Sequence, residues 1–428
     1  MNFLTDFFYT LNKTEINYCV LRNYQALPES TNGSDLDILI FNDDLELFNI
    51  FLREFVKKYN IKLVSFIQDK RCPKYCLLGV NWGLQIDAFN KSIFFGGKEL
   101  IPASVLFANT IIFQGVQVLN PKTGAVLAFL KEILNNKICN IKYITELQKQ
   151  YGNTLIKTEL LSQFPQEFVA YLNQNLNKLD AKHCKKLYNI SKKNFNRSKF
   201  SGFKNKCNRL VKQPGFTIAF LGTDGSGKST IIDNIKPILN DAFHNAVYYE
   251  HMRPNQIPSI ARLSGKKESY SGPVTNPHGS KTSGYLGSLM RWSYYMVDYT
   301  FGFYLKVWPK KAIRSCVWIF DRYYYDYIID PKRSRIKLPK WLFKLGQFII
   351  PEPDIILCLG ADATLIHKRK PELPLKEVER QVAELKAFCA SHNRAVWIET
   401  GQSIENSSNS AIRVIINNMA VRFKSINL

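Results

Sequence analysis

Hydrophobic and polar positions alternate with two different periods in residues 1–115. Residues 18–21 and 37–40 have the length and the mainly apolar character of short strands, and residues 83–90 alternate with the two-residue period of a strand. The apolar positions between 47 and 55 follow a helical period instead, and Asp43-Asp44 is placed to cap that helix. These patterns predict an α+β domain over residues 1–115.

The apolar period then becomes helical, so we expect a helical segment over residues 116–200. Its end is strongly basic, because residues 178–212 carry twelve lysines or arginines against one acid, Asp180. We therefore expect a basic linker at 201–214 and a domain boundary there. The basic stretch is either a solvated helix face followed by a linker, or a surface for acidic lipid or another polyanion.

A second series of strands and helices is expected over residues 215–428. An apolar strand at 216–221 leads through a glycine-rich turn into a helical stretch. Further strand patterns fall at residues 246–249, 315–320, 354–359 and 395–398. Strands that alternate with helices predict an α/β domain, with a parallel sheet covered by helices on both faces.

A long aromatic-rich stretch at residues 284–308 is expected to form a helix that stops at Pro309. Arg291 and Asp298 lie seven residues apart and therefore on one side of this helix. Its aromatic side chains form either part of the core or a surface for a cofactor or lipid. Aromatic stripes usually pack inward, which favours the core.

Composition narrows the class of protein. The chain has 428 residues, 46% hydrophobic and 22% charged, which indicates two or three globular domains and excludes a disordered chain. The excess of 58 Lys and Arg over 35 Asp and Glu gives a formal net charge of +23 and indicates anionic partners. The nine cysteines show no disulfide framework or zinc pattern, and we find no signal peptide, so we expect a cytoplasmic protein.

The clearest chemical motif follows the strand that opens the second series. Residues 222–229, GTDGSGKS, have the glycine-rich pattern whose backbone N–H groups wrap a phosphate at a helix N-terminus. Lys228, exposed without ligand, is placed to reach the β- and γ-phosphates, and the Ser229 hydroxyl is placed to coordinate Mg²⁺. Asp321 and Arg322 follow a later strand, where they can hold the Mg²⁺ shell and a phosphoryl oxygen.

The stretch from residue 216 to about 400 resembles thymidylate kinase and its relatives in the nucleoside monophosphate kinase group. The matching segments are GTDGSGKST at 222–230, Arg253-Pro254, Asp321-Arg322-Tyr323, Pro353-Asp354 and His367-Lys368-Arg369-Lys370. The resemblance implies a P-loop kinase that uses ATP and Mg²⁺ and forms a homodimer. It also implies that Asp224 and Arg253 face the acceptor, that Arg322 binds the acceptor phosphate and that Arg369 closes over ATP.

Motifs and resemblance together give the candidate site residues. The residues expected to bind ATP are Gly222, Thr223, Asp224, Gly225, Ser226, Gly227, Lys228, Ser229 and Thr230. The residues expected to act in catalysis are Lys228, Asp321, Arg322, Asp326 and Arg369. The residues expected to face the substrate are Asp224, Arg253, Asp298, Arg322 and Tyr323. The residues expected to hold Mg²⁺ in this domain are Ser229 and Asp321.

Two features depart from the family pattern, and both fall in the acceptor region. Asp326 stands where the family commonly has a serine, and the segment 255–284 is longer than a compact kinase needs. A carboxylate there opposes an acceptor phosphate but can accept a proton from a hydroxyl. We therefore expect a sugar, an alditol or one of their phosphates as acceptor, in preference to thymidylate. Alternatively, Asp326 merely pairs with Arg333 or Arg335.

In the first domain, Asp35 and Asp37 take alternate positions on a strand and so point to the same side. Together with Asp87 on another strand, they can hold a divalent metal ion. This trio resembles the metal site of the nucleotidyltransferase fold, which implies Mg²⁺ and a second nucleotide here. In that family Gly-Ser opens a helix well before the acids, whereas Gly33-Ser34 directly precede Asp35. Activity of this domain therefore stays open.

The leading hypothesis is an enzyme in which an ATP-dependent kinase for a small molecule is fused to a nucleotidyltransferase-like domain. Proteins resembling this fusion occur in bacterial surface-polysaccharide pathways. One alternative is a true dTMP kinase whose N-terminal half regulates it. Another is a nucleotide-gated module that binds nucleic acid or a membrane surface. We expect no nucleic-acid partner, while membrane-surface contact through the basic stretch stays open.

Overall fold

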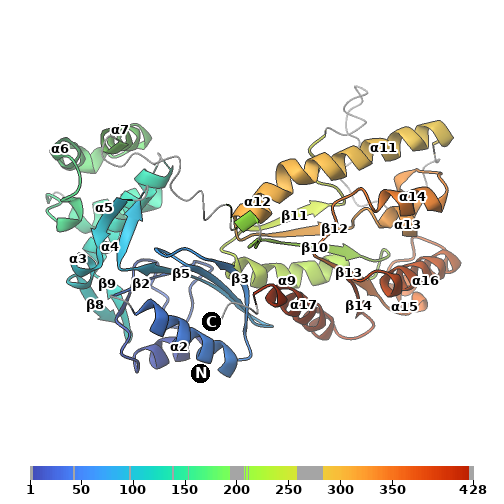
Figure 1. Ribbon diagram of the computed structural model, residues 1–428, viewed down its shortest axis with the longest axis horizontal. Helices are drawn as coiled ribbons and strands as arrows, with labels where there is room; N and C mark the ends of the chain where they lie inside the picture. The colour runs from blue at the N-terminus through green and yellow to red at the C-terminus, as the bar shows by residue number, and fades with distance from the viewer. Residues whose placement is uncertain are drawn as a thin grey trace.

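Two sheets organise the computed structural model, one in each half of the chain (Figure 1). The described residues are 3–41, 44–95, 98–136, 139–152, 154–192, 207, 209–210, 212–257 and 283–423. Most of the predicted basic linker and of the long segment at 255–284 lies outside these residues. The predicted α/β class, with a parallel sheet and covering helices, is confirmed. None of the described helices combines the length and apolar character needed to cross a bilayer.

The N-terminal sheet has seven strands in the order β3-β4-β5-β2-β1-β9-β8. Its strands are β1 Tyr18–Val20, β2 Leu36–Ile40, β3 Lys62–Ile67, β4 Lys74–Leu78, β5 Gly83–Asn90, β8 Thr110–Phe113 and β9 Val116–Leu119. A separate hairpin consists of β6 Ser92–Phe95 and β7 Lys98–Pro102. Strands β2 and β5 run parallel with Asp37 opposite Asp87, so these two side chains leave the same face of the sheet.

Helices cover both faces of this sheet. The described helices of this half are α1 Phe3–Leu11, α2 Leu45–Lys58, α3 Ala103–Phe107, α4 Pro121–Asn136, α5 Ile141–Tyr151, α6 Gln166–Asn175 and α7 Ala181–Lys192, with 3-10 turns Glu159–Leu161 and Leu176–Lys178. Helices α1 and α2 share one apolar core with the sheet, and α4 to α7 share the core on the other side. Asp44 occupies the cap position of α2, but its side chain makes no capping hydrogen bond.

The predicted start of the helical segment at residue 116 is wrong. Residues Val116–Leu119 form β9, which pairs with β1 through Val20 and Val118. The boundary at residue 115 therefore cuts the β8–β9 hairpin, and the N-terminal sheet extends to Leu119. Both hairpin strands are short, so their apolar positions are too few to distinguish a strand from a helix by period.

The C-terminal sheet has five parallel strands in the order β11-β12-β10-β13-β14. These are β10 Phe216–Leu221, β11 Val247–His251, β12 Val317–Asp321, β13 Ile355–Gly360 and β14 Ala395–Glu399. The described helices are α9 Lys228–Ala242, α11 Tyr285–Gly302, α12 Trp308–Ile313, α13 Asp326–Ile329, α14 Lys340–Gly346, α15 Ala363–Arg369, α16 Leu375–Ser391 and α17 Ile404–Val421, with a 3-10 turn Pro331–Ser334. Helices α9 and α17 cover one face, while α11 and α16 contribute to the core on the other.

The predicted end of the aromatic helix at Pro309 is also wrong. Helix α11 continues through a π-helical turn, Phe303–Val307, into α12. Pro309 lies in the first turn of α12, directly after the π-helical turn, and the chain stays helical to Ile313. Buried residues such as Tyr299 and Phe303 fulfil the expected core role. The opposite face of α11 is exposed.

Candidate functional site

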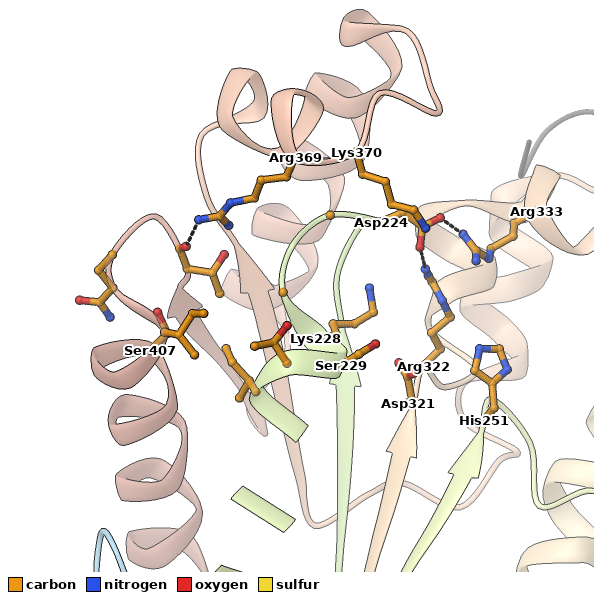
Figure 2. Close-up of a pocket in the computed structure, with 17 residues that line it drawn as sticks. Asp224, Lys228, Ser229, His251, Asp321, Arg322, Arg333, Arg369, Lys370 and Ser407 are labelled. Carbon is orange, nitrogen blue, oxygen red and sulfur yellow. Dashed lines mark hydrogen bonds and ion pairs between the residues drawn. The ribbon is translucent and has the colours of Figure 1, made fainter. Parts of the chain in front are cut away.

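A cavity of about 970 Å³ opens at the carboxyl ends of the central parallel strands (Figure 2). Parallel sheets characteristically place ligand sites at this edge. Its lining is Asp224, Gly225, Gly227, Lys228, Ser229, Thr230, Ile231, His251, Asp321, Arg322, Arg333, Arg369, Lys370, Thr400, Gln402, Ile404 and Ser407. The structure thus gathers most of the predicted ATP-binding residues around one space.

The glycine-rich turn forms the floor of this cavity. Gly225 and Gly227 have φ angles of 85° and 84°, a left-handed backbone that glycine adopts without steric cost. Gly227 is the N-cap of α9, so the first N–H groups of that helix face the cavity lined by Lys228 and Ser229. The local sequence therefore builds a site for a phosphate group.

Lys228 is buried rather than exposed, contrary to the expectation for a ligand-free P-loop. Only 7% of its surface is accessible, and its Nζ donates hydrogen bonds to the carbonyl oxygens of Gly222 and Thr223 at 2.7 and 2.9 Å. Burial lowers the pKa of Lys228 to about 7, and the positive charge of Arg322 acts in the same direction. Both of these hydrogen-bond acceptors are neutral carbonyl oxygens. A bound polyphosphate would place negative charge beside Nζ and so favour the charged ammonium form.

Arg322 and Arg333 are held together by Asp224 of the P-loop. Arg322 donates to Asp224 Oδ1 at 2.6 Å, and Arg333 donates to the other carboxylate oxygen (Figure 2). Burial opposes ionisation of Asp224, but the two arginines outweigh it and hold the pKa of this carboxyl well below its usual range. Arg322 also has a φ of 72°, an uncommon backbone conformation for a non-glycine residue.

Asp326 pairs with a different arginine from the two expected for it. Its Oδ2 accepts from Arg322 at 2.6 Å, so it pairs with neither Arg333 nor Arg335. The side chain is 3% exposed and is absent from the described lining of the cavity. The one-turn helix α13 begins at Asp326 and brings the carboxylate back onto Arg322. Asp326 therefore positions Arg322.

Three residues expected to face the substrate lie away from the described cavity lining. Asp298 is fully buried and accepts hydrogen bonds from Arg253 and from the backbone N–H groups of residues 255–257, so it fixes the chain after β11. The guanidinium of Arg253 forms an ion pair with the Asp298 carboxylate, with 3.0 Å between nitrogen and oxygen. Tyr323 is buried and donates its hydroxyl hydrogen to the Pro351 carbonyl oxygen.

Ser229 and Asp321 lie together beside Lys228, as their expected metal role requires (Figure 2). Asp321 Oδ2 accepts a hydrogen bond from the Tyr249 hydroxyl at 2.9 Å. Its Oδ1 is buried and has no hydrogen-bond partner among the described residues. A buried carboxylate oxygen without a donor, next to a hydroxyl, fits the oxygen ligands that Mg²⁺ prefers.

The lining also includes the predicted Arg369 and several residues that were not predicted from the sequence. Arg369 donates a hydrogen bond to the Thr400 carbonyl oxygen at 2.9 Å. Figure 2 shows Arg369 and the adjacent Lys370 above the P-loop. His251 ends β11 and stands opposite Asp321 in the strand register, so the strand-end rule that identified Asp321 also applies to it. The other unpredicted lining residues are Ile231, Arg333, Thr400, Gln402, Ile404 and Ser407.

The N-terminal half holds a second cluster, formed by Asp35, Asp37 and Asp87. Each contributes a carboxylate oxygen to a group in which all atoms lie within 4.8 Å of one another, and all three side chains are buried. They line a smaller cavity of about 310 Å³. The sequence expectation that Asp87 joins the pair is therefore met in the geometry.

Basic side chains surround this cluster. Arg22 and Lys131 pair with Asp37, and Lys74 pairs with Asp87. Burial works against ionisation of Asp37, but Lys131 and Arg22 overcome it and hold the pKa of Asp37 at about 2.

Asp35 differs from the other two acids. Burial and the negative charge of Asp37 raise its pKa. Its Oδ1 is buried and accepts no hydrogen bond from the described residues, although Arg22 lies 3.5 Å away. Three converging carboxylates with such an oxygen fit a divalent cation, provided that some of the pairing cations move aside.

No protein-family model matches this chain, and no curated protein matches it either. Among solved structures, it is similar to a thymidylate kinase from Candida albicans, with 17% identity, 48% of this chain and 92% of that chain covered, and a TM-score of 0.34. It is also similar to a thymidylate kinase from Ehrlichia chaffeensis, with 17% identity, coverage of 47% and 99%, and a TM-score of 0.32.

Proposed function

We propose that the chain is an ATP- and Mg²⁺-dependent phosphotransferase that acts on a small metabolite bearing a hydroxyl or a phosphate. One observation carries this proposal: the cavity above the P-loop is lined by five cationic side chains and two carboxylates. The cations are Lys228, Arg322, Arg333, Arg369 and Lys370. Such an excess of positive charge around a helix N-terminus suits a bound polyphosphate.

Each group has a part in this scheme. The P-loop backbone and Lys228 would hold the β- and γ-phosphates, and Ser229 with Asp321 would hold Mg²⁺. The ion would neutralise charge on the phosphates when bound. Arg369 and Lys370, above the P-loop, would follow charge onto the transferring group. Because Asp224 and Asp326 fix its guanidinium, Arg322 would grip an acceptor oxygen in a preset orientation.

For a hydroxyl acceptor, His251 is the better candidate base. Asp326 is already engaged with Arg322, whereas His251 lines the cavity next to Asp321. An imidazole can take the hydroxyl proton as the phosphoryl group transfers. The expected acceptor is still a sugar, an alditol or a sugar phosphate. The residue proposed to remove its hydroxyl proton is now His251 instead of Asp326.

The test is a phosphotransfer screen with the full chain, ATP and Mg²⁺. Nucleoside monophosphates, sugars, sugar phosphates and alditols are offered separately, with Lys228→Ala as the inactive control. We expect transfer to one class and a loss of about a hundredfold or more in the variant. Efficient transfer to dTMP alone would favour the dTMP kinase alternative. Nucleotide binding without turnover on any acceptor would favour the binding module.

We also propose that the N-terminal half is a metal-dependent nucleotidyltransferase, because its three buried carboxylates converge within 4.8 Å. Incubating the full chain with Mg²⁺, α-labelled nucleoside triphosphates and the phosphorylated product of the kinase tests this. Label should pass to the acceptor, and Asp37→Asn should abolish transfer while the kinase reaction continues. Absence of labelled product with every triphosphate would reduce this half to a binding or regulatory role. A kinase followed by such a transferase would activate a precursor, as surface-polysaccharide synthesis requires.

For the expected homodimer, we propose the exposed face of α11 and its π-helical turn as the contact surface. None of the exposed positions from residue 283 to 305 carries a charge. Seven large apolar or aromatic side chains there are between 43% and 71% exposed, namely Tyr285, Leu286, Met290, Val297, Phe301, Tyr304 and Leu305. Together they present on the order of 800 Å², about what one partner buries in a stable interface.

A second copy suits this face better than a membrane does. Helices that bind acidic lipid carry free cations along the edge of their apolar face. Of the described lysines next to α11, Lys306 pairs with Glu250, Lys311 pairs with Asp354, and Lys310 lies over the Tyr248 ring. Sedimentation of the full chain should show a dimer that Phe301→Glu dissociates, with Ile141→Glu as the exposed control. A monomer that binds phosphatidylserine vesicles would contradict the proposal.

A further inference from the structure

The two halves of the chain meet along one edge of the N-terminal sheet. Strands β3, β4 and β5 lie against α9 and α17 of the C-terminal half (Figure 1). Val64 and Leu78 are fully buried in the same apolar cluster as Leu239 and Ile415. At Gly83 an added Cβ would lie 2.5 Å from the Ile238 carbonyl oxygen, so strand and helix touch through their backbones. The contact between the halves is therefore close and apolar.

The turn after α9 projects one side chain from this interface into the other half. His244 and Asn245 have φ angles of 45° and 58°, and two successive non-glycine residues in the left-handed region are uncommon. A hydrogen bond of 2.9 Å from Asn245 N–H to the Asn240 carbonyl oxygen holds the turn. His244 Nδ1 accepts a hydrogen bond from the backbone N–H of Asp35 at 3.2 Å.

Asp35 is the acid that most needs this support. Asp37 and Asp87 each pair with a lysine, and Asp37 also pairs with Arg22. The Asp35 carboxylate instead has Arg22 at 3.5 Å and His244 Nδ1 at 3.8 Å, and its Oδ1 accepts no hydrogen bond from the described residues. His244 binds the Asp35 backbone, so it fixes where that carboxylate enters the cluster.

We propose that His244 is a positioning residue for the carboxylate cluster, so that the C-terminal half completes a divalent-cation site in the N-terminal half. This inference rests on the metal-dependent function proposed for Asp35, Asp37 and Asp87. The 15-residue helix α9 begins at Lys228 and ends two residues before His244. A single helix about 22 Å long thus connects the P-loop to the carboxylate cluster.

The experiment measures Mn²⁺ binding to the full chain without nucleotide, using the electron paramagnetic resonance signal of free Mn²⁺. His244→Gly removes the ring and suits the left-handed backbone. His244→Asn tolerates the same backbone and places an amide oxygen near the position of Nδ1. Asn245→Gly is the matched control, because it changes the neighbouring left-handed residue and keeps the ring.

We expect His244→Gly to weaken the Asp37-dependent Mn²⁺ affinity about tenfold, as loss of a residue that orients a metal ligand does. His244→Asn should restore it to within about threefold, and Asn245→Gly should leave it unchanged. The inference is overturned if His244→Gly binds Mn²⁺ as the native chain does, or if His244→Asn melts normally but does not rescue. If the native chain has no Asp37-dependent Mn²⁺ site, the function proposed for the cluster fails as well.

Discussion

At the scale of single residues, the ionisation of Lys228 gives a direct test of the proposed nucleotide binding. Its pKa is lowered by burial to about 7, while an unfolded lysine titrates near 10.4. The folded, ligand-free chain therefore binds fewer protons than the unfolded chain between these values, and this group makes its stability rise with pH across that range. An anionic phosphate beside Nζ reverses the preference and favours the ammonium form.

We therefore predict that ATP binding takes up close to one proton near pH 8.5 and almost none near pH 6. Calorimetry in buffers of different ionisation enthalpy measures this directly, because the observed heat then varies with the buffer. Lys228→Met should remove the uptake at pH 8.5. Heats that are independent of the buffer at pH 8.5 would mean that Lys228 is already charged in the ligand-free chain.

Asp326 gives a second test at this scale. Asp326→Asn removes one of the two carboxylates on a buried arginine, so the free energy of unfolding should fall by about 3 kcal/mol. Acceptor KM should rise because Arg322 is no longer fixed. Denaturant unfolding and the pH profile of kcat are the measurements. Loss of the acidic limb of that profile, with stability unchanged, would restore Asp326 as the catalytic base.

Residues on local motifs were predictable, whereas residues defined by distant partners were not. Lys228, Ser229 and Asp321 belong to motifs at strand ends, and they line the cavity as expected. Asp298 carries no local sign that its partners are Arg253 and the backbone 41 to 43 residues earlier. A buried polar side chain far from the site and a substrate ligand look the same in a sequence.

At the scale of elements, the type of a segment is predictable when the segment shows either a clean alternation or a continuous apolar run, as in β10, which is buried on both faces. The five C-terminal strands follow the predicted pattern to within about two residues. Strands β3 and β4 were not predicted, because their second face packs on α9 and α17 and leaves no clean alternation. The helix end at Pro309 was wrong because a π-helical turn allows the proline to start a new helical segment.

The contact between β5 and α9 gives a prediction for one element pair. Gly83→Ala places a Cβ 2.5 Å from the Ile238 carbonyl oxygen and 2.6 Å from the Ala242 nitrogen, and both are backbone atoms that move only with the helix. We expect a loss of about 1–3 kcal/mol in the free energy of unfolding. Gly284→Ala, where an added Cβ meets no atom of the described residues within 4 Å, should cost far less. Equal denaturation midpoints for the two variants would mean that the strand and the helix are not in contact.

At the scale of the whole molecule, the two halves share one hydrophobic core. Val64, Cys76 and Leu78 are fully buried together with Leu239 and Met419. Contacts between domains of one chain are usually more polar, and they allow relative motion. An apolar contact couples the unfolding of one half to that of the other, because separating the halves exposes these side chains to water.

A ligand of the P-loop should therefore stabilise the N-terminal sheet. At a hundred times its Kd, ATP adds about 2.7 kcal/mol to the unfolding of any unit that binds it. If the halves unfold together, the most protected amides of β4 should exchange hydrogen about a hundredfold more slowly with ATP present, as those of α9 should. Hydrogen exchange followed by mass spectrometry resolves the two segments. Leu78→Lys should abolish the effect in β4 and keep it in α9, since it introduces a charge into the shared core. Slower exchange in α9 alone in the native chain would show that the halves unfold independently.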